Sequence, residues 1–173
     1  MIIDEVQTGF GRTGKWFGIE NFGVEPDLIS MAKALGNGMP VGGIAAKEEL
    51  AKVLTPGTHG TTFGGNPLVT ASAYNTINIM KEEKLVENSY NMGEYLRKQI
   101  SSIKSDEITE LRGMGMINGI EMKTKANDFR KYCLDNGVLV NVCHGNTVRM
   151  IPPLIIGKEH CDRVVGLLKE FLA

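Results

Sequence analysis

The chain has 173 residues and a formal net charge of −1, with the apolar and charged fractions of a globular protein. The balanced charge offers no electrostatic basis for binding nucleic acid or an anionic membrane surface. No apolar run approaches the roughly 18 residues of a membrane span, and no signal-peptide pattern opens the chain.

Cysteines and histidines are few and scattered along the sequence. Cys133, Cys143 and Cys161 form no C-x-x-C pair, which favours reduced thiols in a cytoplasmic protein over a disulfide frame. The three histidines are equally dispersed, so we expect no metal site. Glycine is enriched, and its clusters indicate either tight turns or backbone that approaches a ligand closely. These clusters lie at residues 9–18, 36–43, 57–65 and 113–119.

The first part of the chain predicts strands joined by loops. A short apolar run at residues 1–4 would deliver Asp4 and Glu5 to the edge of a sheet. After a glycine-rich loop, residues 26–31 predict a second strand that ends just before Lys33. A returning strand follows at residues 41–46, and a short helix begins at residue 47. Residues 55–67 are expected to form a loop.

The remaining chain predicts helices alternating with strands. Apolar spacing over residues 68–104 indicates one long helix or two joined ones. Later strands are expected at residues 108–112, 116–122, 138–142 and 147–150, and helices at residues 127–136, stopped by Gly137, and at the C-terminal end. We therefore predict an α/β fold, with residues 1–78 ending a sheet domain and residues 79–173 forming a small α+β domain.

The segment from Gly9 to Lys15 fits the phosphate-binding pattern G-x-x-x-x-G-K. A nucleotide site also needs a Ser or Thr hydroxyl after the lysine to bind magnesium, and Trp16 stands there instead. The acidic residues 4–5 precede this loop so closely that one strand would have to serve both roles. We therefore discard the nucleotide-binding interpretation.

An acid and a lysine at the ends of two strands suit a different cofactor. Pyridoxal phosphate needs an amine that binds it covalently and a carboxylate that keeps its ring nitrogen protonated. Asp4 and Lys33 would meet these needs if both lay at the same edge of an α/β sheet. Taken alone, such a lysine is more often solvated, and such an aspartate more often a turn residue.

Longer strings of sequence decide the interpretation. The strings IDEVQTGFGRTG, EPD and AKALGNGMPVG, at residues 3–14, 25–27 and 32–42, resemble the signature of class III aminotransferases, which have fold type I. HGTTFGGNP and VRMIPPL, at residues 59–67 and 148–154, agree with that family in the right order. The first of these two, together with RGMGM at residues 112–116, is most similar to the acetylornithine branch. The ornithine branch shares nearly all of it.

The resemblance implies roles around the cofactor, pyridoxal 5'-phosphate. Asp4 would pair with the pyridinium nitrogen, Val6 would pack against the ring, and Gln7 would lie near its 3-oxygen. Lys33 would hold the cofactor covalently and then act as the general base. Ordinary strand-end packing is the alternative for Val6 and Gln7, and Glu5 stays open between a structural ion pair with Arg12 and a direct role.

The resemblance also implies a second subunit and a carboxylate site. Thr62, with Thr61 beside it, would hydrogen-bond the cofactor phosphate of the neighbouring subunit, so we expect a homodimer or higher oligomer. Arg149 would clamp the substrate α-carboxylate in a fork. The alternatives are plain loop hydroxyls for the two threonines and a surface role for the arginine.

The function implied is transamination from the δ-position of N-acetylornithine to 2-oxoglutarate, in arginine biosynthesis, by a ping-pong mechanism. Ornithine or another omega-amino acid stays open as the donor. In the family, a second phosphate-binding loop and a ring-stacking aromatic residue precede the position of Asp4. We therefore expect this chain to be the C-terminal portion of such an enzyme, inactive alone. A non-catalytic fragment that self-associates is the alternative from another class.

Overall fold

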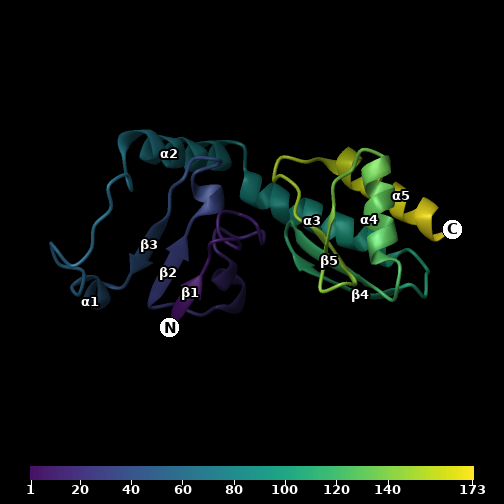
Figure 1. Ribbon diagram of the computed structural model, residues 1–173, viewed down its shortest axis with the longest axis horizontal. Coiled ribbons are helices and arrows are strands. Elements are labelled where there is room, and N and C mark those ends of the chain that lie inside the picture. The colour runs from purple at the N-terminus through teal and green to yellow at the C-terminus, as the bar shows by residue number, and fades with distance from the viewer. The chain divides into compact units, whose positions relative to one another are not determined.

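A computed structural model describes all 173 residues of the chain (Figure 1). It contains two compact units, Met1–Val86 and Glu87–Ala173, and each is described by itself. Both units combine helices with strands, which confirms the predicted α/β class. The predicted division at residue 78 lies inside helix α2 (Pro67–Glu82). That helix continues to Glu82, and Lys84, with a positive φ of 53°, then separates it from the next helix.

The first unit is built on a three-stranded sheet in the order β1-β2-β3. Its strands are β1 (Ile2–Asp4), β2 (Leu28–Met31) and β3 (Gly43–Ala46). Strands β1 and β2 run parallel, whereas β2 and β3 run antiparallel. All three strands lie within the ranges that the sequence predicts, and the parallel pair ends at a single edge of the sheet.

Short helices occupy the connections of the first unit, and two longer helices follow. They are η1 (Gly18–Phe22), η2 (Lys33–Leu35), α1 (Glu48–Ala51), α2 (Pro67–Glu82) and α3 (Leu85–Ser101). The Asn66 side chain caps α2 by accepting the N–H groups of Leu68 at 3.1 Å and Val69 at 3.2 Å. Pro67 suits the first helical position because its missing N–H would have no partner there.

The second unit contains a four-stranded antiparallel sheet in the order β4-β5-β7-β6. Its strands are β4 (Ile108–Met114), β5 (Ile117–Met122), β6 (Asn141–Cys143) and β7 (Thr147–Met150). Burial alternates along β5: Ile120 and Met122 are buried, whereas Gly119 and Glu121 are partly exposed. The sheet therefore has one apolar face and one polar face.

Helices cover the apolar face of this sheet. Helix α3 is joined there by α4 (Ala126–Asp135) and α5 (Lys158–Leu172). The core contains buried side chains from all three helices and from β5 and β7, among them Leu96, Phe129, Leu168, Ile120 and Val148. Burying each large apolar side chain contributes about 1.5–3 kcal/mol. No helix of the chain is both long and apolar enough to cross a lipid bilayer.

The three cysteines are free thiols. Burial raises the pKa of Cys133 and of Cys161 to about 11, with Asp162 and Glu159 adding to the effect at Cys161. Since the thiolate is the reactive form, these two side chains act as small apolar groups of the core.

Strand β6 departs furthest from its predicted range, while β4 extends two residues beyond the predicted residues 108–112. The sequence places β6 at residues 138–142, but the ladder covers only Asn141–Cys143. Gly137, with a φ of 75°, ends helix α4, and the N–H of Val138 donates back to the Cys133 carbonyl oxygen at 2.8 Å. Val138, the first residue of the apolar run, therefore belongs to the turn that ends helix α4. For this reason strand β6 begins only at Asn141.

Helix α3 approaches the turn between β4 and β5 closely at Gly93. A Cβ atom on Gly93 would collide with the backbone of Gly115. The same turn is held by Arg97, whose guanidinium donates to the Gly115 carbonyl oxygen at 3.0 Å and to the Asn118 side chain at 2.6 Å. Only a residue without a side chain permits this contact, because the colliding atoms belong to backbone.

Replacing Gly93 with alanine is expected to destabilise the second unit by about 2–3 kcal/mol, since the clash must be relieved by moving a helix or a turn. Amide hydrogen exchange in β5 measures the loss. Gly166→Ala in helix α5 is the matched control, because a Cβ there meets nothing within 4 Å. That control is expected to be neutral or slightly stabilising. Equal effects of the two substitutions would contradict the packing argument.

Candidate active site

The parallel pairing of β1 and β2 brings an acid and a lysine to one edge of the first sheet. Asp4 is the last residue of β1 and lies beside Ser30 of β2. Lys33 follows the end of β2 by two residues and opens the short helix η2. The carboxyl ends of parallel strands are where α/β folds place ligand-binding groups.

One oxygen of the Asp4 carboxylate is held by neighbouring donors. Its Oδ1 atom accepts the N–H of Val6 at 2.9 Å and the hydroxyl of Ser30 at 3.3 Å. The Oδ2 atom has no hydrogen bond within the chain, and the side chain is exposed. The protein therefore orients the Asp4 carboxylate, and its Oδ2 atom can still accept a hydrogen bond from a ligand.

Lys33 combines a strained backbone with a free amine. Its φ of 43° lies in the left-handed region, which is unusual for a residue with a long side chain. The ammonium makes no hydrogen bond or ion pair, and Lys33 is one of the residues that line an open hollow of about 630 Å³. The other residues that line this hollow are Ala32, Gly38, Met39, Pro40, Val41 and Gly42. The lysine therefore meets open space and no competing acid.

The backbone after Lys33 is fixed by a tight turn. The N–H of Gly36 donates to the Lys33 carbonyl oxygen at 3.1 Å, and the Ser72 hydroxyl of helix α2 donates to the Gly36 carbonyl oxygen at 2.9 Å. A Cβ on Gly36 would collide with the Met39 carbonyl oxygen. This glycine of the predicted cluster is therefore required by the turn.

The loop that follows Asp4 is organised by a buried carboxylate that sequence reasoning did not identify in this role. Glu5 is 1% exposed. Its carboxylate accepts the N–H groups of Gly18 at 2.9 Å and Ile19 at 2.7 Å, together with the Thr8 hydroxyl. Glu5 thereby caps the helix η1 and anchors the glycine loop.

Of the other first-unit residues named from the sequence, Val6 donates its backbone N–H to Asp4, whereas Gln7, Thr61 and Thr62 make no hydrogen bond to Asp4 or Lys33. Val6 and Gln7 occupy the turn directly after β1, where Val6 is partly buried and Gln7 is exposed. Thr61 and Thr62 lie in an exposed loop; the Thr61 hydroxyl accepts the N–H of Gly64 at 3.1 Å. No hydrogen bond joins either threonine to Asp4 or Lys33.

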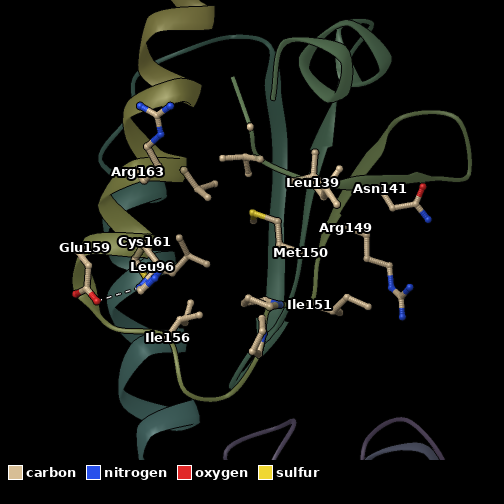
Figure 2. Close-up of a pocket in the computed structure, with 17 residues that line it drawn as sticks. Leu96, Leu139, Asn141, Arg149, Met150, Ile151, Ile156, Glu159, Cys161 and Arg163 are labelled. Carbon is tan, nitrogen blue, oxygen red and sulfur yellow. Dashed lines mark ion pairs between the residues drawn. The ribbon is translucent and has the colours of Figure 1, made fainter. Parts of the chain in front are cut away.

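Arg149 lies on strand β7 of the second unit. Its chain neighbours Val148 and Met150 are buried, and Figure 2 shows its side chain directed away from Met150. The opposite residues are Gly119 of β5 and Asn141 of β6. Arg149 is partly buried as a residue, and its guanidinium makes no hydrogen bond or ion pair within the chain. An arginine left in this state is suited to bind an anion from outside.

Comparison with known proteins gives a family-level match. A family model described as aminotransferase class-III matches residues 1–172. Acetylornithine aminotransferase of Methanosarcina mazei is 49% identical over 170 residues, 98% of this chain and 42% of that protein. Ornithine aminotransferase 1 of Staphylococcus saprophyticus is 42% identical over 173 residues, 99% of this chain and 44% of that protein.

A solved structure agrees in fold. The ornithine aminotransferase of Toxoplasma gondii, crystallised with oxidised glutathione, has a TM-score of 0.91 and 34% identity, over 99% of this chain and 42% of that one. That structure is described as having PLP at partial occupancy in its active site. This chain spans less than half the length of these relatives.

The cap formed by Glu5 is tested by replacing Glu5 with glutamine. Glutamine keeps the shape but replaces one of the two carboxylate oxygens with an NH₂ group, so the N–H of either Gly18 or Ile19 loses its acceptor at a cost of about 1–3 kcal/mol. Hydrogen exchange at the amides of Gly18 and Ile19 is expected to accelerate by about tenfold or more. Glu49→Gln, an exposed position in helix α1, is the control. Unchanged protection of both amides would contradict the capping role.

Proposed function

This chain belongs to the class-III aminotransferase family, which confirms the resemblance carried by its motifs, and we propose that the protein containing it transfers amino groups with pyridoxal 5'-phosphate as cofactor. The observation that carries the proposal is the placement of Asp4 and Lys33 at one sheet edge, each with a free functional group. These are the two groups that the cofactor requires of its protein.

The residues present fit this cofactor chemically. The free oxygen of Asp4 can accept a hydrogen bond from a protonated pyridine nitrogen, while Val6 and Ser30 keep the carboxylate oriented. Lys33 has an unpaired amine and lines an open hollow of about 630 Å³. When bound, the cofactor supplies an electron sink that stabilises negative charge on the substrate carbon next to the transferred nitrogen.

Residues of the chain itself would bind the cofactor and move a proton. Lys33 would hold the cofactor covalently and then act as the general base that removes the proton from the substrate carbon bearing the transferred nitrogen. Val6 would pack against the ring, and Gln7 would hydrogen-bond near its 3-oxygen. The exposed hydroxyls of Thr61 and Thr62 would bind the phosphate in the site of a neighbouring subunit, so a homodimer is part of the proposal.

The proposed substrates are N-acetylornithine and 2-oxoglutarate. The higher identity to an acetylornithine aminotransferase than to an ornithine aminotransferase supports the acetylated donor. Ornithine is the second candidate, because relatives of that activity match the chain over the same length. The acceptor carries a carboxylate directly beside its reacting carbonyl carbon, and the unpaired guanidinium of Arg149 is the group proposed to bind it. The donors react at the δ-carbon, so their own α-carboxylate lies farther from the reacting centre.

Borohydride reduction in the presence of pyridoxal 5'-phosphate is expected to attach the pyridoxyl group to Lys33. Peptide mass mapping locates the label. Lys47 is the internal control, because its ammonium is paired with Asp27 at 3.0 Å and should stay unlabelled. Label on other lysines with Lys33 untouched would refute the assignment.

Replacing Arg149 with alanine in the full-length protein is expected to raise KM for 2-oxoglutarate and, in the reverse reaction, for glutamate. Losing a charged hydrogen bond from a shielded site costs about 1.5–3 kcal/mol, which corresponds to about one to two decades in KM. Arg130→Ala, an exposed arginine of helix α4 without an ion pair, is the control for charge alone. An unchanged KM for both substrates would remove Arg149 from the site.

A further inference from the structure

The turn that carries Lys33 has a strained backbone. Lys33, Asn37 and Gly38 have φ angles of 43°, 45° and 105°, all of them positive. Two of these three residues carry side chains, which that part of conformational space disfavours. Such a conformation persists only where the surrounding contacts impose it. The contacts that hold this turn therefore decide where the Lys33 side chain leaves the backbone.

Local hydrogen bonds shape the turn without anchoring it. The N–H of Gly36 donates to the Lys33 carbonyl oxygen, and the N–H of Met39 donates to the Gly36 carbonyl oxygen, both at 3.1 Å. Strands β2 and β3 pair with each other and hold the two ends of the turn. Bonds between near neighbours move together with the turn, so its middle needs a contact from another element to be fixed.

Helix α2 supplies such a contact. The Ser72 hydroxyl donates to the Gly36 carbonyl oxygen at 2.9 Å, across 36 positions of sequence. Gly36 is buried and Ser72 is half-buried. Water therefore competes less for this bond than for one at the surface, which strengthens it. The bond ties the backbone just after Lys33 to a helix that is itself capped by Asn66.

Ser72 uses its hydroxyl differently from the two threonines of the same helix. Thr70 donates to the Asn66 carbonyl oxygen at 3.0 Å, and Thr76 donates to the Ser72 carbonyl oxygen at 2.8 Å. Both bond to the turn that precedes them, as hydroxyl side chains in helices commonly do. Ser72 directs its hydroxyl to another segment, although alanine would be the better helix former at this position. The serine thus serves the turn and not the helix.

We propose that Ser72 is a positioning residue that holds the Lys33 turn in its strained conformation and so keeps the Lys33 amine in place for catalysis. This inference rests on the proposed role of Lys33. Once Lys33 has released the cofactor to act as a base, no covalent link restrains it, and its backbone sets the reach of the amine. Ser72 touches no reacting atom in this scheme, because it acts through Gly36.

The test compares Ser72→Ala with Thr76→Val in the full-length protein. Each removes one hydroxyl from helix α2, but only the first removes a bond to the Lys33 turn. Single turnovers are measured with N-acetylornithine and, separately, with glutamate. Ser72→Ala is expected to slow both by about three- to tenfold, the effect of one lost hydrogen bond, because Lys33 is the base for both substrates. The half-saturating concentrations should stay within about twofold, since no binding group is lost. Thr76→Val should change neither quantity.

A second measurement uses the protein without cofactor. Amide hydrogen exchange at Gly36 and Met39 is expected to accelerate by about three- to tenfold in Ser72→Ala and to stay unchanged in Thr76→Val. Unchanged exchange would overturn the inference, and faster exchange with unchanged turnover would overturn the positioning role. If borohydride leaves Lys33 unlabelled in the unmutated protein, the proposed function itself fails. Should Ser72→Ala fail to fold, Ser72→Cys, whose thiol donates weakly, replaces it with the same criteria.

Discussion

The candidate site depends on the parallel register of β1 and β2. Asp4 of β1 lies beside Ser30 of β2, and Ser30 holds β1 through two hydrogen bonds. Its hydroxyl donates to the Asp4 carboxylate, and its carbonyl oxygen accepts the N–H of Glu5 at 3.0 Å. A slip of one residue would turn every side chain of a strand to the opposite face. The juxtaposition of Asp4 and Lys33 is therefore a consequence of strand pairing.

Burial of Glu5 is the second constraint, because it decides how the chain returns from β1 to β2. A buried carboxylate is costly unless donors satisfy it, and here two backbone N–H groups and a hydroxyl do so. The glycines of the loop provide the space: a Cβ on Gly18 would lie 3.2 Å from the Glu5 carboxylate, and one on Gly9 would lie 2.8 Å from its carbonyl oxygen. This part of the glycine cluster serves internal packing and not a ligand.

The sequence predicted elements better than it predicted contacts. Strands β1, β2 and β7 and the helix end at Gly137 follow from local signals, namely apolar runs and a helix-stopping glycine. The placement of Asp4 and Lys33 was predicted because strand ends and family motifs indicated the same edge. The cap made by Glu5 joins residues 13 and 14 positions apart, and no local pattern reveals such a bond. Gly119, a glycine inside a strand, was a usable signal of close approach that was not followed, since a Cβ there would lie 3.1 Å from the Thr147 methyl group.

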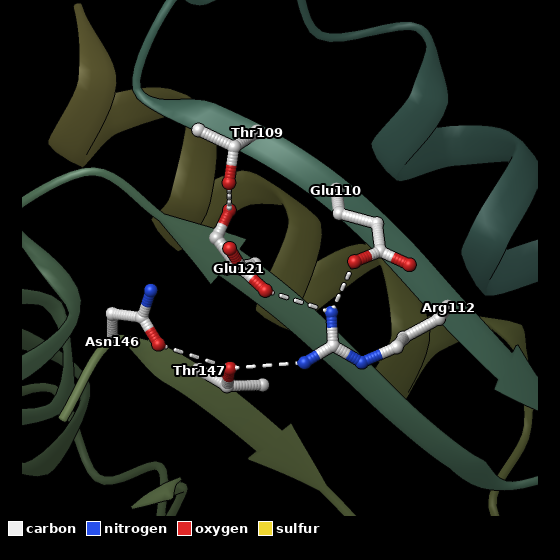
Figure 3. Close-up of polar contacts among 6 residues, drawn as sticks. All are labelled: Thr109, Glu110, Arg112, Glu121, Asn146 and Thr147. Carbon is white, nitrogen blue, oxygen red and sulfur yellow. Dashed lines mark hydrogen bonds and ion pairs between the residues drawn. The ribbon is translucent and has the colours of Figure 1, made fainter. Parts of the chain in front are cut away.

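Charged residues in both units divide into those paired within the fold and those left open. Lys47 is bonded to Asp27, which is the main cause of its raised pKa, whereas Lys33 has no acidic neighbour within bonding distance. In the second unit Arg112 engages two glutamates (Figure 3), and Arg149 engages none. Because an ammonium or guanidinium already bound to a carboxylate must first be released, only the open groups can take up an external carbonyl or carboxylate without that cost.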